Sequence, residues 1–297
     1  MEFIYLIIIV IGIYVILASS FNFVIGYGGL LSIAHPAFFA IGAYTAGILA
    51  RDLGWSGWIT IPIGAMMAFC CSIIVSLPAL RISGDYLIIA SIGFQLGLIE
   101  VLKNLKITGG AGGLSNIPAF LVPQIGSAGY AALVTVTALL VVLLLRYVAH
   151  GPYGRAVTAM RDDEAAFAAL GRSPMWLKLW VLALGSGIAG FAGGIYALYF
   201  RYVTPEQFDV MQSNIILTMV MVGGMRTTWG PVVGAVLLEI LPQAITFLNL
   251  PPSVLGPLQG IIFTSLVLIF MFVRPGGLIS AGQYWHGSDY GPARRVP

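Results

Sequence analysis

Long apolar runs separated by short polar segments dominate this chain. A helix that crosses a hydrocarbon layer roughly 30 Å thick needs about 20 apolar residues, because each residue rises about 1.5 Å. None of the runs alternates with the period of two that a barrel strand requires. The pattern therefore predicts an all-α, polytopic transmembrane bundle of about nine spans, forming one domain over residues 1–297. The predicted spans cover residues 3–25, 30–50, 57–80, 86–102, 127–145, 179–200, 210–225, 230–248 and 255–273.

The composition agrees with a membrane protein and gives an orientation. Hydrophobic residues make up 59% of the chain and charged residues 8%, against about 25% charged in soluble domains. This excludes a soluble enzyme, a disordered chain and a nucleic-acid binder. With the loop 146–178 inside, ten basic residues lie on the inner side and four on the outer side, which predicts a cytoplasmic C-terminus and an outward N-terminus. The inner set is Arg81, Arg146, Arg155, Arg161, Arg172, Lys178, Arg226, Arg274, Arg294 and Arg295, and the outer set is Arg51, Lys103, Lys106 and Arg201.

Catalytic patterns are absent from the sequence. No lysine follows a glycine, so the phosphate-binding loop GxxxxGK followed by Ser or Thr cannot occur, and we expect no ATP hydrolysis by this chain itself. The histidines His35, His150 and His286 are far apart and lack metal-ligand spacing. The adjacent Cys70 and Cys71 are interpreted as small core residues. We predict a chain with no catalytic residue, metal or cofactor of its own.

Two carboxylates, Glu100 and Glu239, fall inside apolar runs, where an unpaired charge is costly. Glu100 lies three residues before Lys103, and this spacing favours a structural ion pair. Glu239 is followed by Pro242 and Gln243 and is the better candidate for a polar position inside the bundle. A proton-coupling site made of the two carboxylates remains open at this stage.

Uncharged polar residues at helical spacing form a further pattern. Ser91 and Gln95 share one helix face, and Asn214 and Thr218 share another. Such faces either hold helices together or line a polar path, and packing is the favoured interpretation for each pair. Asn22, near the end of the first span, is ambiguous in the same way. The candidate substrate-pathway residues are Asn22, Ser32, His35, Ser91, Gln95, Asn214, Thr218 and Glu239.

Small residues recur at a spacing of four in the span 179–200. Ser186, Gly190 and Gly194 form one ridge, and a second ridge lies beside it at Gly185, Ala189, Gly193 and Ala197. Small ridges let helix backbones approach closely, so we predict a packing seam without chemistry.

Two glycine-rich stretches also match at a constant offset, which indicates either an internal repeat or two helix starts with an early proline. The matched positions are Gly28, Gly29, Ser32 and Pro36 with Gly223, Gly224, Thr227 and Pro231.

The loop 146–178, with its coupling segment 150–177, is the one long and highly charged inner segment. Residues 153–171 are rich in helix formers, with Gly171 as a C-terminal stop and Pro174 three residues on. Such a helix outside the membrane has no apolar surface of its own to bury against, so we interpret it as a docking element for a cytosolic partner. A solvated linker helix is the alternative. The candidate coupling residues are Arg155, Arg161, Asp162, Asp163, Glu164, Ala165, Ala166 and Gly171.

Several stretches in order along the chain resemble one family. They are NFVIGYGGLLSIAHPAFFAIGAY from Asn22, GDYLIIASIGF from Gly84, TGGAGGLS from Thr108, the segment 154–171 with its RDDEAA core, GGMRTTWGPVVG from Gly223 and RPGGL from Arg274. The family is that of the permease subunits of bacterial ABC importers for branched-chain amino acids, and the chain is most similar to the second of the two permeases.

This resemblance implies a set of partners in the bacterial inner membrane. They are a second permease, two cytosolic subunits that bind ATP and Mg, and a periplasmic substrate-binding protein, with lipid around the spans. Glu164, Ala165 and Ala166 would carry the ATPase-contacting EAA motif. One position departs from that motif, because Leu170 stands where glycine is usual and Gly171 comes one residue later.

Other functions stay open at this stage. Related permeases carry urea or short amides, and a path lined by small apolar residues would suit those solutes as well. An ion-coupled secondary transporter would need deep ionisable residues, which only Glu239 approaches. A purely structural membrane subunit would explain the packing seam but not the polar faces.

Overall fold

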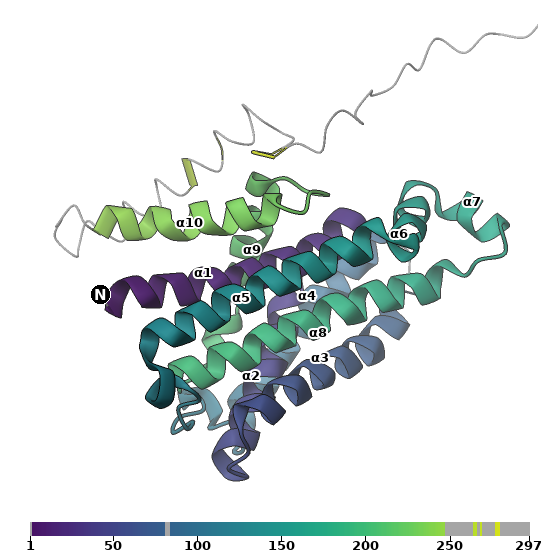
Figure 1. Cartoon of the computed structure of the whole chain (residues 1–297). Helices are drawn as coiled ribbons and strands as arrows, with labels where there is room; N and C mark the ends of the chain where they lie inside the picture. Colours follow the sequence, from purple (N-terminus) through teal and green to yellow (C-terminus); the bar gives the residue numbers. More distant parts are fainter. Residues whose placement is uncertain (1, 81–83, 247–263, 266–267, 269–276, 280–297) are drawn as a thin grey trace, which may run out of the picture.

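The computed structural model describes residues 2–80, 84–246, 264–265, 268 and 277–279, and within them the chain is an all-α bundle (Figure 1). Long apolar helices run roughly side by side, and two short helices project at one end. The helices are α1 (Glu2–Asn22), α2 (His35–Asp52), α3 (Gly57–Ala79), α4 (Gly84–Asn104), α5 (Val122–His150), α6 (Pro152–Asp162), α7 (Glu164–Ala169), α8 (Pro174–Phe200), α9 (Val210–Gly223) and α10 (Gly230–Thr246).

Each predicted span from 3–25 to 230–248 contains a helix, but the span 30–50 was placed too early, because residues 30–34 are not helical and α2 begins at His35. Five helical stretches are long and apolar enough to cross a membrane, and α9 and α10 are shorter apolar helices. Helix α5 is broken by non-helical backbone at Gly126, so its long second part begins where the predicted span 127–145 does. The predicted span 255–273 lies almost wholly outside the described residues. Both matched glycine-rich stretches open a helix with an early proline, Pro36 in α2 and Pro231 in α10, which confirms the simpler interpretation of that match.

The bundle has two ends of different character. At one end, Arg161 donates a hydrogen bond to the carbonyl of Gly26, and Asp162 lies 3.8 Å from Arg226. We call this the coupling end. At the far end, Arg51 donates to the Ile107 carbonyl. The chain enters α1 at the far end and α6 and α7 lie at the coupling end (Figure 1).

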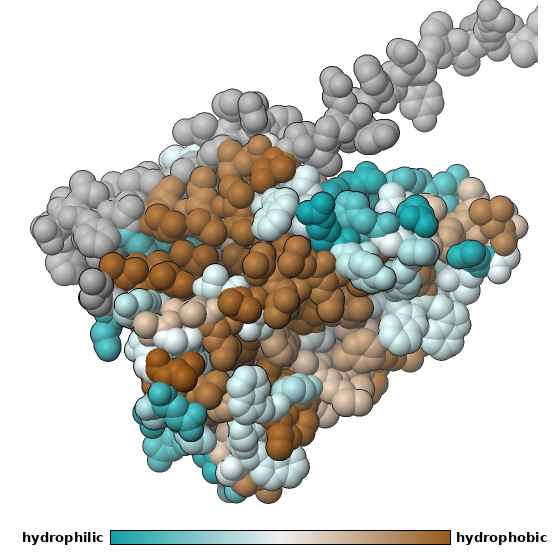
Figure 2. Space-filling model, viewed as in Figure 1, coloured by the Kyte–Doolittle hydropathy of each residue, from teal (hydrophilic) through white to brown (hydrophobic). Residues whose placement is uncertain are grey.

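The surface between the two ends is apolar. In Figure 2, hydrophobic side chains gather over α1, α5 and α10, while hydrophilic ones gather around α6 and at the opposite end. The free cysteines do not follow the prediction of core residues, because Cys70 is exposed and Cys71 is half-buried. The prediction was wrong for Cys70 because α3 lies at the edge of the bundle and presents one face outward.

Helix α8 packs in the centre of the bundle through its two small ridges. Ser186 donates to the Ser72 hydroxyl of α3 at 3.0 Å, and Gly190 lies so close to α3 that an added Cβ would meet the Ala68 Cβ at 2.4 Å. On the second ridge, an added Cβ at Gly193 would meet the Phe39 carbonyl oxygen of α2 at 2.1 Å. The predicted seam is therefore two seams, one facing α3 and the other facing α2.

We predict that Gly190→Leu disrupts this packing. The added side chain has no space between α8 and α3, and overpacking of this kind costs about 1–3 kcal/mol or more. The measurement is the yield and the thermal midpoint of the purified protein in detergent. Gly97→Leu is the control, since Gly97 of α4 has open space where a Cβ would stand. Equal yields and midpoints for the two variants would refute the seam.

Candidate functional site

The predicted inner helix is two short helices, α6 and α7, with a break at Asp163. The prediction of one continuous helix over 153–171 was wrong there, because Asp163 has an extended backbone and its side chain caps α7 by accepting from the Ala166 amide at 2.9 Å. Aspartate favours such caps over helix interiors. Gly171 comes directly after the end of α7 with a φ of 78°, so it ends the helix as the sequence predicted.

Helix α6 is anchored on the bundle by its apolar side. Val157 is fully buried and Met160 is 2% exposed, and Val157 packs in a cluster that includes Phe23 and Val181. The expectation that this segment has nothing of its own to bury against was therefore wrong for α6. The apolar side of α6 is used within the chain, so α6 fixes the position of α7 relative to the bundle.

Polar contacts attach the end of α6 to two other segments. The Arg161 guanidinium donates to the Gly26 carbonyl in η1 (Phe23–Tyr27), a π-helical turn that continues α1. Burial and the neighbouring Arg226 guanidinium lower the pKa of Arg161 from its ordinary value. Asp162 faces Arg226 in the loop between α9 and α10. The end of α6 is therefore tied to both α1 and the α9–α10 loop.

Helix α7 leaves most of its side chains exposed. Phe167 is buried, and Glu164 makes a 2.6 Å ion pair with Lys178 at the start of α8. Leu170, just after α7, is 79% exposed and adds an apolar side chain to this surface. We call eight exposed residues of α6, α7 and the turn after α7 the coupling surface. They are Arg155, Asp162, Asp163, Glu164, Ala165, Ala166, Leu170 and Gly171.

Deeper in the bundle, two non-helical segments meet. Residues 28–34 lead into α2, and residues 201–209, with the 3-10 turn η3 (Pro205–Phe208), lead into α9. Non-helical backbone at membrane depth must find hydrogen-bond partners inside the protein. Here three side chains supply them, and we call these three the central network. They are Ser91, Gln95 and Ser213.

The central network joins both segments to α4 and α9. The Ser91 hydroxyl accepts from the Ile33 amide at 2.9 Å, and the Ser213 hydroxyl lies 2.9 Å from the Ile33 carbonyl. Gln95 donates to the Phe208 carbonyl at 2.9 Å and lies 3.0 Å from Ser213 through its amide oxygen. Of the predicted pathway residues, Ser91 and Gln95 thus hold backbone in place. The sequence analysis missed Ser213, since its contacts are with residues more than a hundred positions away.

Three further predicted pathway residues, His35, Asn22 and Ser32, are also buried. His35, at the start of α2, lies 2.8 Å from the Ser20 hydroxyl of α1. Asn22 donates to the Thr227 carbonyl at 2.9 Å and accepts from the Arg226 amide at 3.0 Å, so it fixes the α9–α10 loop. Ser32 is 8% exposed within the segment 28–34. The structure brings His35 together with α1 and places Asn22 at the coupling end.

Asn214 and Thr218 lie on a different surface. Asn214 is exposed on α9, and the Thr218 hydroxyl donates to the Asn214 carbonyl at 2.7 Å, a bond within the helix. Glu100, the other intramembrane carboxylate, lies 3.6 Å from Lys103, so the predicted ion pair is confirmed. Among the described residues, no side-chain hydrogen bond or ion pair joins Asn214, Thr218 or Glu100 to the central network.

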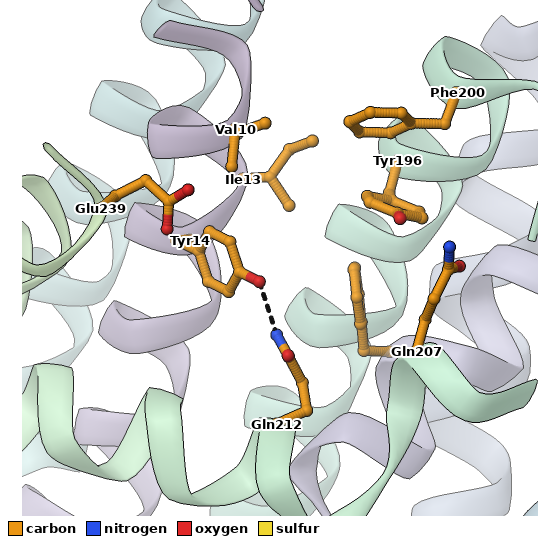
Figure 3. A pocket seen from close by; sticks show the side chains of 9 residues that line it. Val10, Ile13, Tyr14, Tyr196, Phe200, Gln207, Gln212 and Glu239 are labelled. Atoms are coloured by element: carbon orange, nitrogen blue, oxygen red, sulfur yellow. Dashed lines mark hydrogen bonds between the residues drawn. The ribbon is translucent and has the colours of Figure 1, made fainter. Parts of the chain in front are cut away.

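Glu239 lines a cavity of about 250 Å³ that opens among α1, α2, α8, α9 and α10. The nearby Tyr14 hydroxyl accepts from the Gln212 side-chain amide at 2.8 Å (Figure 3). Sequence analysis found Glu239 but missed the other polar lining residues, because Tyr14 sits in an apolar run and Gln207 in a loop. Among the described residues, no His, Cys, Asp and Glu side chains gather in a way that could hold a metal ion. The cavity is lined by Val10, Ile13, Tyr14, Phe39, Tyr196, Phe200, Gln207, Gln212 and Glu239.

An apolar helical bundle with buried polar groups and an exposed charged element at one end is typical of a membrane transport permease, and comparison with known proteins agrees with this class. The chain belongs to the family described as "Branched-chain amino acid transport system / permease component", whose model matches residues 3–272.

Curated relatives of the chain carry matching names. It is 32% identical over 294 residues to the "High-affinity branched-chain amino acid transport system permease protein LivM" of Escherichia coli, covering 90% of this chain and 68% of the relative. It is 29% identical over 233 residues to the "Probable branched-chain amino acid transport permease protein LivM" of Methanocaldococcus jannaschii, covering 74% and 67%. No solved structure matches the chain significantly.

We predict that Gln95→Leu destabilises the bundle. It leaves the Phe208 carbonyl and part of Ser213 without a partner, and an unpaired buried polar group costs about 1–3 kcal/mol. The thermal midpoint in detergent should therefore fall. Thr137→Val is the control, because the Thr137 hydroxyl bonds only within its own helix α5 and should change stability by no more than about 0.5 kcal/mol. A Gln95→Leu midpoint equal to that of the control would contradict the role of the central network.

Proposed function

We propose that this chain is a membrane-spanning permease subunit of an ABC importer that moves branched-chain amino acids inward, driven by partner ATPases. The observation that carries the proposal is the coupling surface, a charged and partly apolar element that the bundle holds rigidly and leaves exposed. Family membership and the names of the relatives support the transport role and the class of solute. The chain itself would be non-catalytic.

The partners belong to the same proposal. Two cytosolic subunits would bind ATP and Mg and contact the coupling surface, a second permease would complete the membrane part, and a periplasmic binding protein would deliver the amino acid. The coupling end would then face the cytoplasm of the inner membrane, with the C-terminus on the same side. The backbone bonds of Leu278 and Ile279 to Val222 and Gly223, at the end of α9, are consistent with this side.

The coupling step is a rigid-body movement. When the ATP-binding subunits close, a force on α7 passes through the Glu164–Lys178 ion pair to α8 and through α6 to Arg161. Arg161 acts on η1, and Asp162 acts on the α9–α10 loop through Arg226. Both segments adjoin the parts of the bundle that meet at the central network. The bundle then shifts between outward and inward access.

Two alternative functions would require different partners or residues. An ABC permease for urea or short amides would share the coupling mechanism and differ only in the solute. An ion-coupled secondary transporter would work without ATPase subunits and would need ionisable groups deep in the bundle. Glu239 is the described residue that favours it. Transport by the purified chain alone in vesicles would support the second alternative.

We predict that Glu164→Lys and Arg161→Glu each abolish substrate-stimulated ATP hydrolysis in the assembled complex. The first variant reverses the charge paired with Lys178, and the second places a carboxylate against the Gly26 carbonyl. Membrane insertion should be unchanged, since neither residue is within a span. The assay is phosphate release by the reconstituted complex with and without loaded binding protein.

The control for this assay is Lys106→Glu, a charge reversal on an exposed residue at the far end. It should keep full stimulation. If Glu164→Lys and Arg161→Glu were stimulated as well as this control, the coupling surface would not contact the ATPase.

A further inference from the structure

The cavity beside Glu239 has the composition of a site for a small zwitterion. One part of its wall is aliphatic and aromatic, from Val10 and Ile13 of α1 and Phe200 of α8. The polar groups are few and come from separate elements: Tyr14, Gln207, Gln212 and Glu239. At about 250 Å³ it is smaller than the roughly 300–1,000 Å³ typical of pockets for drug-sized ligands. The size suits a single small solute with an apolar side chain.

Glu239 places a carboxyl group on the cavity wall, and no other described side chain pairs with it. Among the described residues, no hydrogen bond or ion pair joins its carboxylate to another side chain, and it points toward Tyr14 (Figure 3). The Tyr14 hydroxyl accepts from Gln212, so its own proton remains free to donate. A carboxylate in an apolar setting is costly unless a cation or a donor meets it. A primary ammonium group would satisfy this carboxylate.

Gln207 supplies a complementary donor elsewhere on the cavity wall. Its amide oxygen accepts from the Thr204 backbone amide at 3.2 Å, which orients the side chain and leaves its NH₂ group without a partner among the described residues. Figure 3 shows this NH₂ group on the Tyr196 side of the cavity and Glu239 on the Tyr14 side. A free amide donor is suited to a carboxylate.

We propose that this cavity binds the amino acid during transport, with Glu239 holding the ammonium group, Gln207 the carboxylate, and Val10, Ile13 and Phe200 the branched side chain. The assignment rests on the proposed function and narrows its solute class. Urea and simple amides carry no ammonium group, so they offer Glu239 only neutral N–H donors, which bind a carboxylate about half as strongly as charged donors do. A site that needs both charges of the zwitterion therefore selects amino acids over those solutes.

The test uses the whole complex, with both permeases, the ATPase subunits and the binding protein, in vesicles loaded with ATP. Uptake of radiolabelled L-leucine is compared for wild type, Glu239→Gln and Gln207→Glu, which both keep the side-chain shape. Every sample contains the same binding protein, so differences in uptake between samples come from the permease variant and not from the selectivity of the binding protein. We expect each variant to lose at least about tenfold in uptake, as for a lost charge-assisted hydrogen bond. Glu239→Asp, which keeps the charge, should restore most of the uptake.

Co-purification of the ATPase subunits at wild-type yield shows that each variant is assembled. Glu100→Gln is the matched control, because it makes the same substitution at the exposed Glu100, and its uptake should equal wild type. Wild-type uptake in assembled Glu239→Gln would overturn the cavity assignment alone. If Glu239→Gln does not assemble, the uptake of assembled Gln207→Glu is used instead. Wild-type uptake in that variant would likewise overturn the cavity assignment. Absence of ATP-dependent leucine uptake in wild type would overturn the proposed function and this assignment together.

Discussion

The rest of this structure depends on the need to satisfy non-helical backbone where it is buried inside the bundle. Residues 28–34 and 201–209 interrupt the helices, and each buried backbone group left unpaired there would cost about 1–3 kcal/mol. The central network meets that need with side chains from α4 and α9. The network therefore links the two interrupted segments through hydrogen bonds to Ile33 and Phe208. Broken helices of this kind recur at solute sites in other transporters.

The coupling end attaches to the first of these two segments and to the α9–α10 loop. Gly29, which adopts a φ of 67°, lies against the Arg161 side chain, and Asn22 holds the α9–α10 loop from the end of α1. Helix α6 is thus packed against the start of the segment 28–34, while α7 remains open to a partner. This arrangement explains why a short cytosolic element can act on a bundle whose centre is closely packed by the glycines of α8.

Much of the fold could be predicted from the sequence, and less of the site. Run length identified the helices, and the glycine spacing identified α8 as a packing helix, because both are local properties of the chain. Local reasoning failed at Asp163, where a single cap divides the inner helix, and at Val157, whose apolar partners include residues of η1 and α8. It could not find Ser213, which bonds to residues far away in the sequence, or Gln207, which lines a cavity formed by remote segments. Glu239 was found because a carboxylate in an apolar run is conspicuous wherever it lies.

The central claim is that a partner ATPase drives this bundle through α7, and cross-linking at Ala166 tests it most directly. Ala166→Cys, in a chain with Cys70 and Cys71 replaced by serine, is oxidised in the assembled complex. Leu53→Cys, at the exposed far end of α2, serves as the comparison. The account predicts a disulfide or bifunctional cross-link from position 166 to the ATP-binding subunit and none from position 53. A cross-link from position 53, or labelling of position 166 by a membrane-impermeant thiol reagent added from the periplasm, would contradict it.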